Sequence, residues 1–485
     1  MPDDEVRVLS LGDMLLRRKG TGVQRVLHAL ISVALRLFFR RIETSRASLV
    51  PTEGPLVFVL NHPNGAIDPA LVFAALPRRI SFLAKSTVFS LPVVGSVLRA
   101  FETLPLYRRV DAGADVARNQ LTFAACRELL RRGRCIALFP EGVSHNSPKL
   151  LPVKTGAARI ALGAISVGST NDNPSGGEAA ESALPLELKI VPVGLYYTSK
   201  TSFRSEALMR FGEPLRVRPV ELDEEGEPPR EAVRELSARI EAALRKVTLN
   251  TETEEQLGVV QKAERLLSSI YEGINVELPL AARFDSLRRL AAGRWTEWLS
   301  AGGGVEDLRR RVTSYEEELR RIGLTPENLS LSRHSRWYVF RHFLLRTALL
   351  LVLAPLAVPG ALLHLPAYLL CTLAARLFPK HGVDEIAPTV KIVTAIALMP
   401  LTWLIVSALA FYFWGWRAAL FAFPLSILCG YVALRSFEEL HDMRGWFRAV
   451  LLLLRRRRLF LRLLIERRAL RNELSRVGDG GDERG

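Results

Sequence analysis

Cysteine is scarce in this sequence. The 485 residues contain four cysteines and no CxxC pair, which argues against a zinc site and against a disulfide framework. The first ten residues, MPDDEVRVLS, are acidic and polar and lack the apolar core of a signal peptide. We therefore expect the water-soluble part of the chain to face a reducing cytoplasm.

Positive charge, in contrast, is in excess. Lys and Arg outnumber Asp and Glu by 66 to 50, a net charge of +16, which favours an anionic partner such as nucleic acid, acidic lipid headgroups or a phosphorylated substrate. Hydrophobic residues make up 49% of the chain and the mean hydropathy is +0.15, which indicates a membrane protein. The length exceeds what one packed core usually needs, so two or more units are expected.

From about residue 50 to 220 the pattern is typical of an α/β fold. The short runs PLVFVL, ISFLAK, RCIALF and LKIVPVGLYY are rich in β-branched and aromatic residues, and helical stretches separate them. Strands that alternate with helices predict a mostly parallel sheet covered by helices on both faces. The small polar segment 168–182 is predicted to be a surface loop.

Three apolar runs without a formally charged residue follow, at 347–375, 392–414 and 418–434. Such runs fit membrane helices better than a buried soluble core. The Pro-Gly centre of the first run predicts a pair of short helices, broken or re-entrant, whereas the other two predict a hairpin of spanning helices. Arginines crowd the segments on either side. The positive-inside rule is satisfied if each apolar block enters and leaves on the cytoplasmic side.

Two further segments combine helical spacing with many arginines. Residues 23–41 carry an apolar stripe flanked by arginines, which fits either an amphipathic helix on a bilayer surface or an ordinary core-facing helix. The tail interleaves Leu and Phe with four arginines at 455–458, which suits attraction to anionic lipid. A nucleic-acid partner ranks lower because the neighbouring segments are membrane-bound.

These patterns divide the chain into five expected parts. They are an N-terminal membrane-associating helix (1–45), an α/β domain (46–225), a charged helical region (226–340), a transmembrane region of two hairpins (341–436) and a basic amphipathic tail with a disordered end (437–485). The charged helical region shows no obvious site.

The segment NHPNGAIDPA, 61–70, places His62 directly after an apolar strand and Asp68 six residues later. Residues six apart do not share one face of a helix. They can meet if His62 lies in the loop and Asp68 opens the next helix, which the favoured Asp-Pro start supports. An imidazole whose second nitrogen is held by a carboxylate is a competent general base. Alternatively, Asp68 is only a helix cap and His62 only a turn residue.

Three later segments place polar groups at the same sheet edge, because loops that follow parallel strands gather there. LPLYRR ends in Arg108 and Arg109, which suit a phosphate. FPEGVSH places Glu141 in a turn after a strand, and Lys154 precedes a helix whose N-terminus also favours an anion. Each segment alone is compatible with an ordinary surface, but the four together favour a site.

In this order, NHPNGAID, LPLYRR, FPEGVSH and IVPVGLYY resemble the four sequence blocks of the glycerolipid acyltransferases, the superfamily of glycerol-3-phosphate and lysophosphatidic acid acyltransferases. FLAKSTVF and KTGAARIAL add a resemblance to the subgroup that includes fungal glycerol-3-phosphate and dihydroxyacetone-phosphate acyltransferases. The resemblance covers about residues 50 to 220 and makes 46–225 the acyltransferase domain. It implies direct acyl transfer without a cofactor, from acyl-CoA or acyl carrier protein to a phosphorylated glycerol-type acceptor, in phospholipid biosynthesis.

The same resemblance implies base catalysis. His62 takes the proton of the acceptor hydroxyl, and Asp68 fixes the tautomer of His62 and stabilises the imidazolium. Asn61 orients the loop. The oxyanion that forms needs hydrogen-bond donors, which the sequence does not identify.

The acceptor site is also implied by the resemblance. Arg109, with Arg108 beside it, holds the acceptor phosphate, Glu141 and Gly142 shape the acceptor pocket, and Lys154 adds positive charge. Many family members have TRS after FPEG where this chain has VSH. That departure puts a phosphate contact from this turn in doubt and makes the two arginines and the lysine more important.

Several alternatives stay open at this point. The acceptor is glycerol 3-phosphate, dihydroxyacetone phosphate or lysophosphatidate, and acyl exchange between phospholipids is a further enzymatic alternative. A membrane scaffold with an inactive domain is disfavoured by the intact His62, Asp68 and Glu141. A nucleic-acid binder would need aromatics among the arginines of the soluble part, whereas aromatics concentrate in the apolar runs.

Overall fold

The computed structural model divides into two compact units, Met1–Asn250 with Asp384–Thr389, and Thr251–Val383 with Val390–Gly485. The residues whose structure is described are 5–16, 20–76, 78–90, 92–107, 116–166, 187–223, 226–268, 278–292, 305–326, 328–329, 336–377 and 383–479. The surface loop predicted at 168–182 and the expected disordered end lie outside these residues, the latter from residue 480 onwards.

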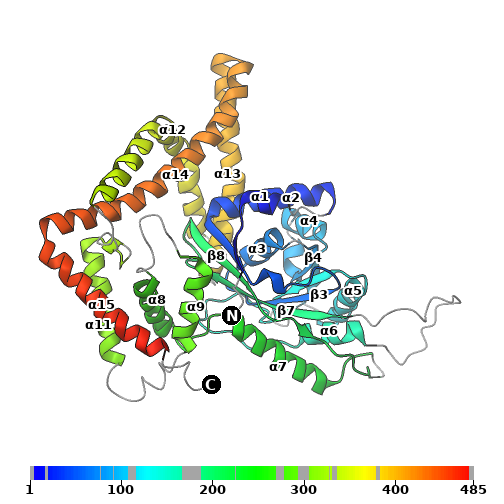
Figure 1. Cartoon of the computed structure of the whole chain (residues 1–485). Coiled ribbons are helices and arrows are strands. Elements are labelled where there is room, and N and C mark those ends of the chain that lie inside the picture. The colour runs from blue at the N-terminus through cyan, green and yellow to red at the C-terminus, as the bar shows by residue number, and fades with distance from the viewer. Residues whose placement is uncertain are drawn as a thin grey trace. The chain divides into compact units, whose positions relative to one another are not determined.

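A mostly parallel sheet forms the centre of the first unit, as the alternating pattern predicts (Figure 1). The strand order is β1-β2-β8-β7-β3-β6-β4-β5, with β9 beside β7. The run β7-β3-β6-β4-β5 is parallel, and β8 and β9 pair antiparallel with β7. The strands are β1 (Val6–Val8), β2 (Phe39–Ser45), β3 (Leu56–Leu60), β4 (Ile80–Lys85), β5 (Leu104–Leu106), β6 (Cys135–Leu138), β7 (Lys189–Tyr197), β8 (Ser205–Phe211) and β9 (Leu215–Arg216).

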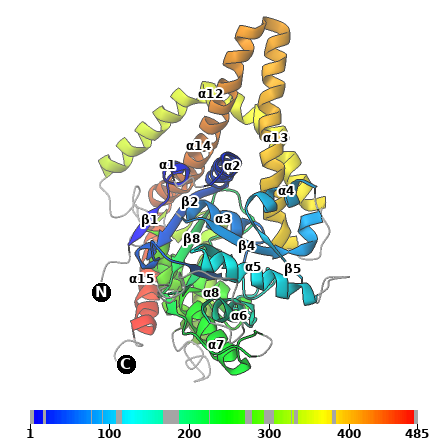
Figure 2. The same cartoon turned by 90° about the vertical axis from the view of Figure 1, so that its right-hand side faces the viewer.

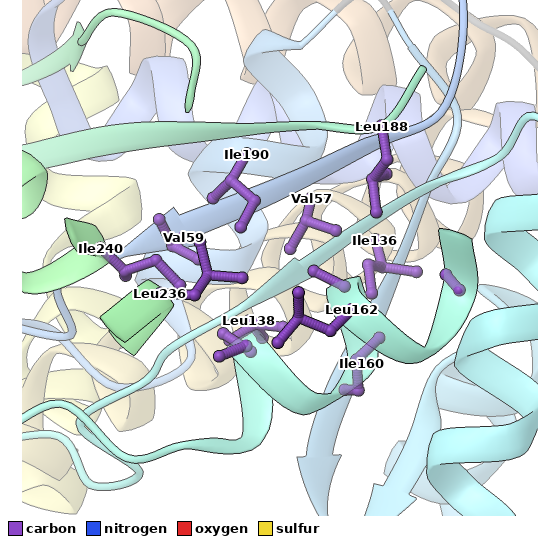
Figure 3. Packing of buried hydrophobic residues seen from close by; sticks show 14 of the residues in the cluster. Val57, Val59, Ile136, Leu138, Ile160, Leu162, Leu188, Ile190, Leu236 and Ile240 are labelled. Atoms are coloured by element: carbon purple, nitrogen blue, oxygen red, sulfur yellow. The ribbon is translucent and has the colours of Figure 1, made fainter. Parts of the chain in front are cut away.

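The central strands are apolar because helices cover both faces of the sheet. Every residue of β3, LVFVL, is buried, as expected for a parallel strand between two helical layers. Figure 1 shows α2 and α3 on one face and α6 and α7 on the other. Figure 3 shows the core on the second face, which includes Val57, Val59, Ile136, Leu138, Ile160, Leu162, Leu188, Ile190, Leu236 and Ile240. The helices are α1 (Leu11–Leu16), α2 (Gly22–Phe38), α3 (Ile67–Ala75), α4 (Pro92–Ala100), α5 (Asn119–Arg131), α6 (Gly156–Ile165) and α7 (Arg230–Val247).

The first unit extends beyond the expected domain of 46–225 at both ends. The helix expected over 23–41 ends at Phe38, and the following residues form β2 inside the sheet, where most of their side chains are buried. At the other end, α7 packs its apolar face into the core. A Cβ at Gly194 of β7 would overlap the carbonyl oxygen of Val247. The absence of a side chain there lets α7 end directly against the sheet.

Helix α2 turns its apolar stripe outward. The exposed stripe consists of Val23, Val26, Leu30, Val33 and Leu37. The buried face carries the polar residues Gln24, His28 and Ser32 together with Leu35 and Phe38. The Gln24 amide donates to the carbonyl of Ala100 at 2.6 Å, which fixes this orientation. The structure therefore does not show the alternative of a core-facing apolar stripe.

The second unit is helical over the residues that the structure describes. Its charged helices are α8 (Glu254–Ser268), α9 (Leu280–Ala292), α11 (Val305–Ile322) and α15 (Arg457–Asp479). The basic tail packs on the helices that precede the apolar region, because α15 buries Phe460, Leu463, Leu470 and Leu474 completely. The hydroxyl of Tyr315 in α11 donates to the carbonyl of Leu463 at 3.2 Å, and Arg311 pairs with Glu473 at 2.8 Å.

Within the part of the chain that the structure describes, three apolar helices are long enough to span a membrane: α12 (Arg336–Leu377), α13 (Val383–Trp414) and α14 (Trp416–Arg455). α13 and α14 form the expected hairpin, which turns at Gly415. α12 differs from the expected pair of short helices because it is one continuous helix of 42 residues. Figures 1 and 2 show it bending near its middle, where Pro355 and Pro359 remove backbone hydrogen bonds. In apolar surroundings a bent helix keeps more backbone bonds satisfied than a broken one.

The apolar helices contact one another through small and polar residues. α12 meets α14 at Gly360, where a Cβ would overlap the carbonyl of Cys429, as is common for close helix pairs in membranes. His364 donates from Nδ1 to the carbonyl of Gly360 at 2.8 Å and accepts at Nε2 from the indole of Trp403 in α13 at 2.9 Å. Cys371 and Cys429 are buried free thiols, in accord with a packing role.

Candidate active site

His62 and Asp68 meet at the carboxyl edge of the sheet. His62 follows β3, and Asp68 lies in the first turn of α3. The Nδ1 atom of His62 is 2.8 Å from Oδ2 of Asp68. The N-cap of α3 is Ala66, so Asp68 does not cap the helix as its Asp-Pro sequence suggested. Its Oδ2 instead accepts a hydrogen bond from the main-chain N–H of Asn64 at 2.7 Å, which secures the loop between strand and helix.

The carboxylate determines the tautomer of the imidazole. The Asp68 side chain is completely buried, and an ionised carboxylate only accepts hydrogen bonds. Nδ1 of His62 therefore carries the hydrogen, and Nε2 carries the basic lone pair. The His62 ring stacks on Phe139 with centroids 4.0 Å apart and planes 16° apart, and its side chain is 19% exposed. The fixed ring can thus offer one basic nitrogen to a reactant.

Tyr197 of β7 reaches the other oxygen of Asp68. Its hydroxyl donates to Oδ1 at 2.6 Å. Burial, together with the negative charge of Asp68, raises the pKa of Tyr197 well above its usual range, so the phenol keeps its proton and remains a donor. Nothing in the spacing points to this pair, which is 129 residues apart. Strand alternation is the one sequence feature that bears on this contact. It turns only one of the two adjacent tyrosines of GLYY towards the face of the sheet that carries Asp68.

The buried carboxylate of Glu141 holds the main chain of the same histidine. Its Oε1 accepts from the N–H of His62 at 2.9 Å, and its Oε2 accepts from the N–H of Leu151 at 2.8 Å and from Nε2 of His145. Glu141 is 2% exposed. The resemblance implies that this residue shapes the acceptor pocket, which stays a prediction. In the structure both of its oxygens contact protein groups. In this position Glu141 braces the loop that contains His62, because it holds the main chain of that residue by a hydrogen bond.

Two further bonds join the FPEGVSH turn to the His62 loop. The N–H of His145 donates to the carbonyl of His62 at 3.2 Å, and the N–H of Gly65 donates to Oγ of Ser144 at 2.9 Å. Nδ1 of His145 accepts from the N–H of Ser147 at 3.1 Å, so its Nε2 carries the hydrogen that faces the buried carboxylate. In this chain, the residues that replace TRS tie two loops together.

Other predicted residues surround this centre. The side-chain amide of Asn61 donates to the carbonyl of Leu195 at 3.0 Å and accepts from its N–H at 2.7 Å, so it ties the loop to β7. Its role in orienting the loop for catalysis stays a prediction. Gly142 has φ of +75°, and a Cβ there would overlap the ammonium of Lys154. The exposed Lys154 therefore lies against the turn that contains Glu141.

The two predicted phosphate-binding arginines, Arg108 and Arg109, lie outside the described residues. A cation that the sequence pattern did not single out does lie at the turn. Nζ of Lys200, just after β7, donates to Oδ1 of Asn146 at 2.8 Å and to the carbonyl of His145 at 3.2 Å.

Two family models match most of the chain. Residues 41–196 match the acyltransferase family, and residues 259–479 match the Glycerol-3-phosphate acyltransferase 2 C-terminal domain. The second match runs across the residues that composition divides into a charged region, a transmembrane region and a tail. This agrees with the packing of α15 on α11.

Several fungal proteins are similar to the chain. Glycerol-3-phosphate O-acyltransferase 2 of Saccharomyces cerevisiae is 29% identical over 60% of this chain and 38% of its own length. Glycerol-3-phosphate O-acyltransferase 1 of the same yeast is 28% identical over 78% of this chain and 59% of its own. An uncharacterized acyltransferase of Schizosaccharomyces pombe is 26% identical over 83% of this chain and 68% of its own length. The chain thus spans less than two thirds of both Saccharomyces proteins.

The first unit has a mostly parallel α/β sheet with a His–Asp pair at its carboxyl edge. Residues 41–196 of this unit match the acyltransferase family. Together these findings define the class of protein. This chain belongs to the glycerolipid acyltransferase superfamily. Within the superfamily, the match of the second unit and the Saccharomyces relatives place it with the fungal glycerol-3-phosphate acyltransferases.

Proposed function

We propose that this chain is a membrane-bound O-acyltransferase. It transfers a fatty acyl group from acyl-CoA, or from acyl carrier protein, to a hydroxyl of glycerol 3-phosphate or a related phosphorylated acceptor, and so supplies phospholipid biosynthesis. The observation that carries the proposal is the 2.8 Å contact of His62 with Asp68 at the sheet edge where α/β folds bind ligands. The names of the Saccharomyces relatives favour glycerol 3-phosphate as the acceptor.

The geometry suits direct transfer by general-base catalysis. Nε2 of His62 takes the proton of the acceptor hydroxyl as the acceptor oxygen attacks the thioester carbonyl. Asp68 stabilises the imidazolium that forms. The tetrahedral intermediate then collapses and the carbon–sulfur bond breaks. The imidazolium gives its proton to the leaving thiolate, so the products are an ester and a free thiol, without a covalent acyl-enzyme.

Cations near the base suit the acceptor phosphate. Lys154 is exposed and lies against the turn that braces His62, so its ammonium can reach a phosphate while the acceptor hydroxyl approaches the imidazole. We assign Lys154 to this phosphate together with Arg108 and Arg109, whose role rests on the resemblance of LPLYRR to the family.

The packing of the second unit supports one membrane topology. α11 precedes the apolar helices and α15 follows them, yet the Tyr315–Leu463 bond and the Arg311–Glu473 pair join the two. Helices in contact lie on the same side of a bilayer, so the chain between them crosses an even number of times. The α13–α14 hairpin supplies two crossings, and the bent α12 enters and leaves on one face. The flanking arginines favour the cytoplasmic face for the charged helices and for the acyltransferase unit, which a short link joins to α8.

The outward stripe of α2 suits the surface of the same membrane. Its exposed aliphatic side chains repeat at helical spacing, and the exposed Arg25 suits anionic headgroups. In nanodiscs, a fluorophore at Leu30→Cys should be quenched by brominated lipid chains, whereas one at Arg245→Cys, on the exposed side of α7, should not. Equal quenching at the two positions would contradict this contact.

An acyl-transfer assay decides the function. The purified full chain in nanodiscs is given labelled acyl-CoA with glycerol 3-phosphate, dihydroxyacetone phosphate, lysophosphatidate or a lysophospholipid. We expect transfer to glycerol 3-phosphate and a loss of about 10²- to 10⁴-fold in His62→Ala, with unchanged membrane insertion. His441→Ala, at an exposed position of α14, is the matched control. Undiminished transfer by His62→Ala would reject the base, and transfer to lysophosphatidate alone would reject the acceptor.

A further inference from the structure

Resting on the proposed function, we propose that Tyr197 is a positioning residue for acyl transfer, which keeps the carboxylate of Asp68 directed at His62. The hydroxyl of Tyr197 is 2.6 Å from Oδ1 of Asp68, while Oδ2 of the same carboxylate contacts Nδ1 of His62 at 2.8 Å. The phenol, the carboxylate and the imidazole thus form a continuous hydrogen-bonded chain that ends at the basic nitrogen.

The phenol is held from two strands and cannot easily turn away. Tyr197 is the last residue of β7 and pairs with Ala207 of β8 in an antiparallel register. Its ring stacks on Phe39 of β2, with centroids 5.6 Å apart. Strand pairing fixes the main chain and stacking fixes the ring, so the position of the hydroxyl follows from the sheet itself.

The carboxylate needs this donor because the Asp68 side chain is completely buried. A buried carboxylate stays ionised only where hydrogen bonds replace the water that it has lost. The N–H of Asn64 and the imidazole serve Oδ2, and the phenol serves Oδ1. Without the phenol, the charge of Asp68 would be less well compensated, and the carboxylate would be free to rotate away from Nδ1 of His62.

Either change would affect the reaction at one step. When His62 takes the acceptor proton, the imidazolium is stabilised by a carboxylate that is charged and aligned with Nδ1. Tyr197 does not contact the reactants in this scheme and acts only through Asp68. The expected effect of its loss is therefore on the rate of the chemical step and not on substrate binding.

Adjacent residues of β7 provide a matched pair of variants. Tyr197→Phe removes the hydroxyl and leaves the ring that stacks on Phe39. Tyr196 precedes it on the opposite face of the strand and is only partly buried, so Tyr196→Phe makes the same chemical change away from Asp68. We expect kcat of Tyr197→Phe to fall about 10-fold, the size of one hydrogen bond to a charged group. The KM values for both substrates, and all constants of Tyr196→Phe, should stay near those of the unchanged chain.

A double-variant cycle separates positioning from a general effect on stability. If Tyr197 acts through the Asp68 carboxylate, adding Tyr197→Phe to Asp68→Asn should cost less than about 2-fold. A residue that only stabilises the fold would give the same factor in both backgrounds. Full kcat in Tyr197→Phe, or multiplicative losses in the cycle, would overturn this inference while leaving the proposed function intact. Absence of transfer by the unchanged chain with every acceptor would overturn both.

Discussion

Glu141 accepts a hydrogen bond from the main-chain N–H of His62 at 2.9 Å, so two buried carboxylates place the imidazole. Asp68 holds the ring, and Glu141 holds the peptide from which the ring extends. Each carboxylate contacts three donors, and these donors compensate its charge in the absence of bulk water. The base is therefore fixed before a substrate arrives, which avoids the cost of ordering it during the reaction.

Removing the imidazole of His145 should slow the reaction without weakening substrate binding. His145→Ala deletes one of the three donors to the buried Glu141, so the carboxylate is less well compensated and holds the main chain of His62 less firmly. We expect kcat to fall about 10-fold, because a hydrogen bond to a charged group is lost. The KM for each substrate should change little. Steady-state kinetics of the full chain in nanodiscs measure both constants.

Two further variants test whether the loss of rate comes from the hydrogen bond between His145 and Glu141. His145→Gln keeps an N–H donor at a similar reach and should recover most of the rate, while His441→Ala in α14 should have no effect. An equal loss of kcat in His145→Ala and His145→Gln would contradict a role for the His145–Glu141 hydrogen bond in holding the main chain of His62. A raised KM for the acceptor would instead mean that His145 contacts the substrate.

Local sequence pattern was sufficient to predict the centre of the site. A buried apolar strand followed by a loop and a helix start leaves few ways to place His62 and Asp68, and contact is one of them. The same pattern places Asn61 at the start of this loop, where its side chain bonds to the main chain of β7. The apolar runs PLVFVL and IVPVGLYY predict parallel strands because their residues must be buried on both faces of a sheet.

The supporting contacts depend on packing between distant segments, which local pattern does not describe. Tyr197 and Leu151 reach the two carboxylates only because β7 and the turn before α6 are folded beside β3. The outward face of α2 depends on the bond from Gln24 to Ala100, since spacing alone fits both orientations. The continuity of α12 through Pro355 depends on its apolar surroundings, which favour helical backbone even at a proline. The roles of the two LPLYRR arginines remain predictions.

Lys154→Ala should raise the KM for a phosphorylated acceptor about 10-fold and lower kcat less. The ammonium of Lys154 lies against the turn that braces His62. In the proposed function it holds the acceptor phosphate, and a charge-assisted contact of this kind contributes about 1.5–3 kcal/mol. Arg109→Ala should act in the same direction. The exposed Lys149 provides the matched control Lys149→Ala. A raised KM for acyl-CoA instead would assign Lys154 to the phosphates of the donor.

Gly194→Ala should destabilise the first unit. The added methyl group would overlap the carbonyl oxygen of Val247, so α7 must shift from the core, at a cost of about 1–3 kcal/mol. Gly258→Ala in α8, where a methyl group would meet open space, should instead stabilise its helix by about 1 kcal/mol. Thermal unfolding of both variants in one detergent measures the opposite shifts. An unchanged melting temperature in Gly194→Ala would contradict the docking of α7 against β7.

Single cysteines should report an even number of membrane crossings. The four native cysteines are buried and can be replaced. New cysteines then go to four exposed positions: Arg320 in α11, Leu377 at the end of α12, Arg417 near the tip of the α13–α14 hairpin and Arg468 in α15. In sealed vesicles of one orientation, a membrane-impermeant maleimide should label Arg320→Cys, Leu377→Cys and Arg468→Cys from the same side. It should reach Arg417→Cys only from the other side.

The expected labelling follows from the contact between α11 and α15, the charged helices that precede and follow the apolar region. The buried phenol of Tyr315 and the Arg311–Glu473 pair keep α11 against α15, and no membrane can lie between helices in contact. If α12 crossed the bilayer, Arg320→Cys and Leu377→Cys would be labelled from opposite sides. Labelling of Arg320→Cys and Arg468→Cys from opposite sides would mean that α11 and α15 are separated in the membrane-bound protein, and the even-crossing topology would then be wrong.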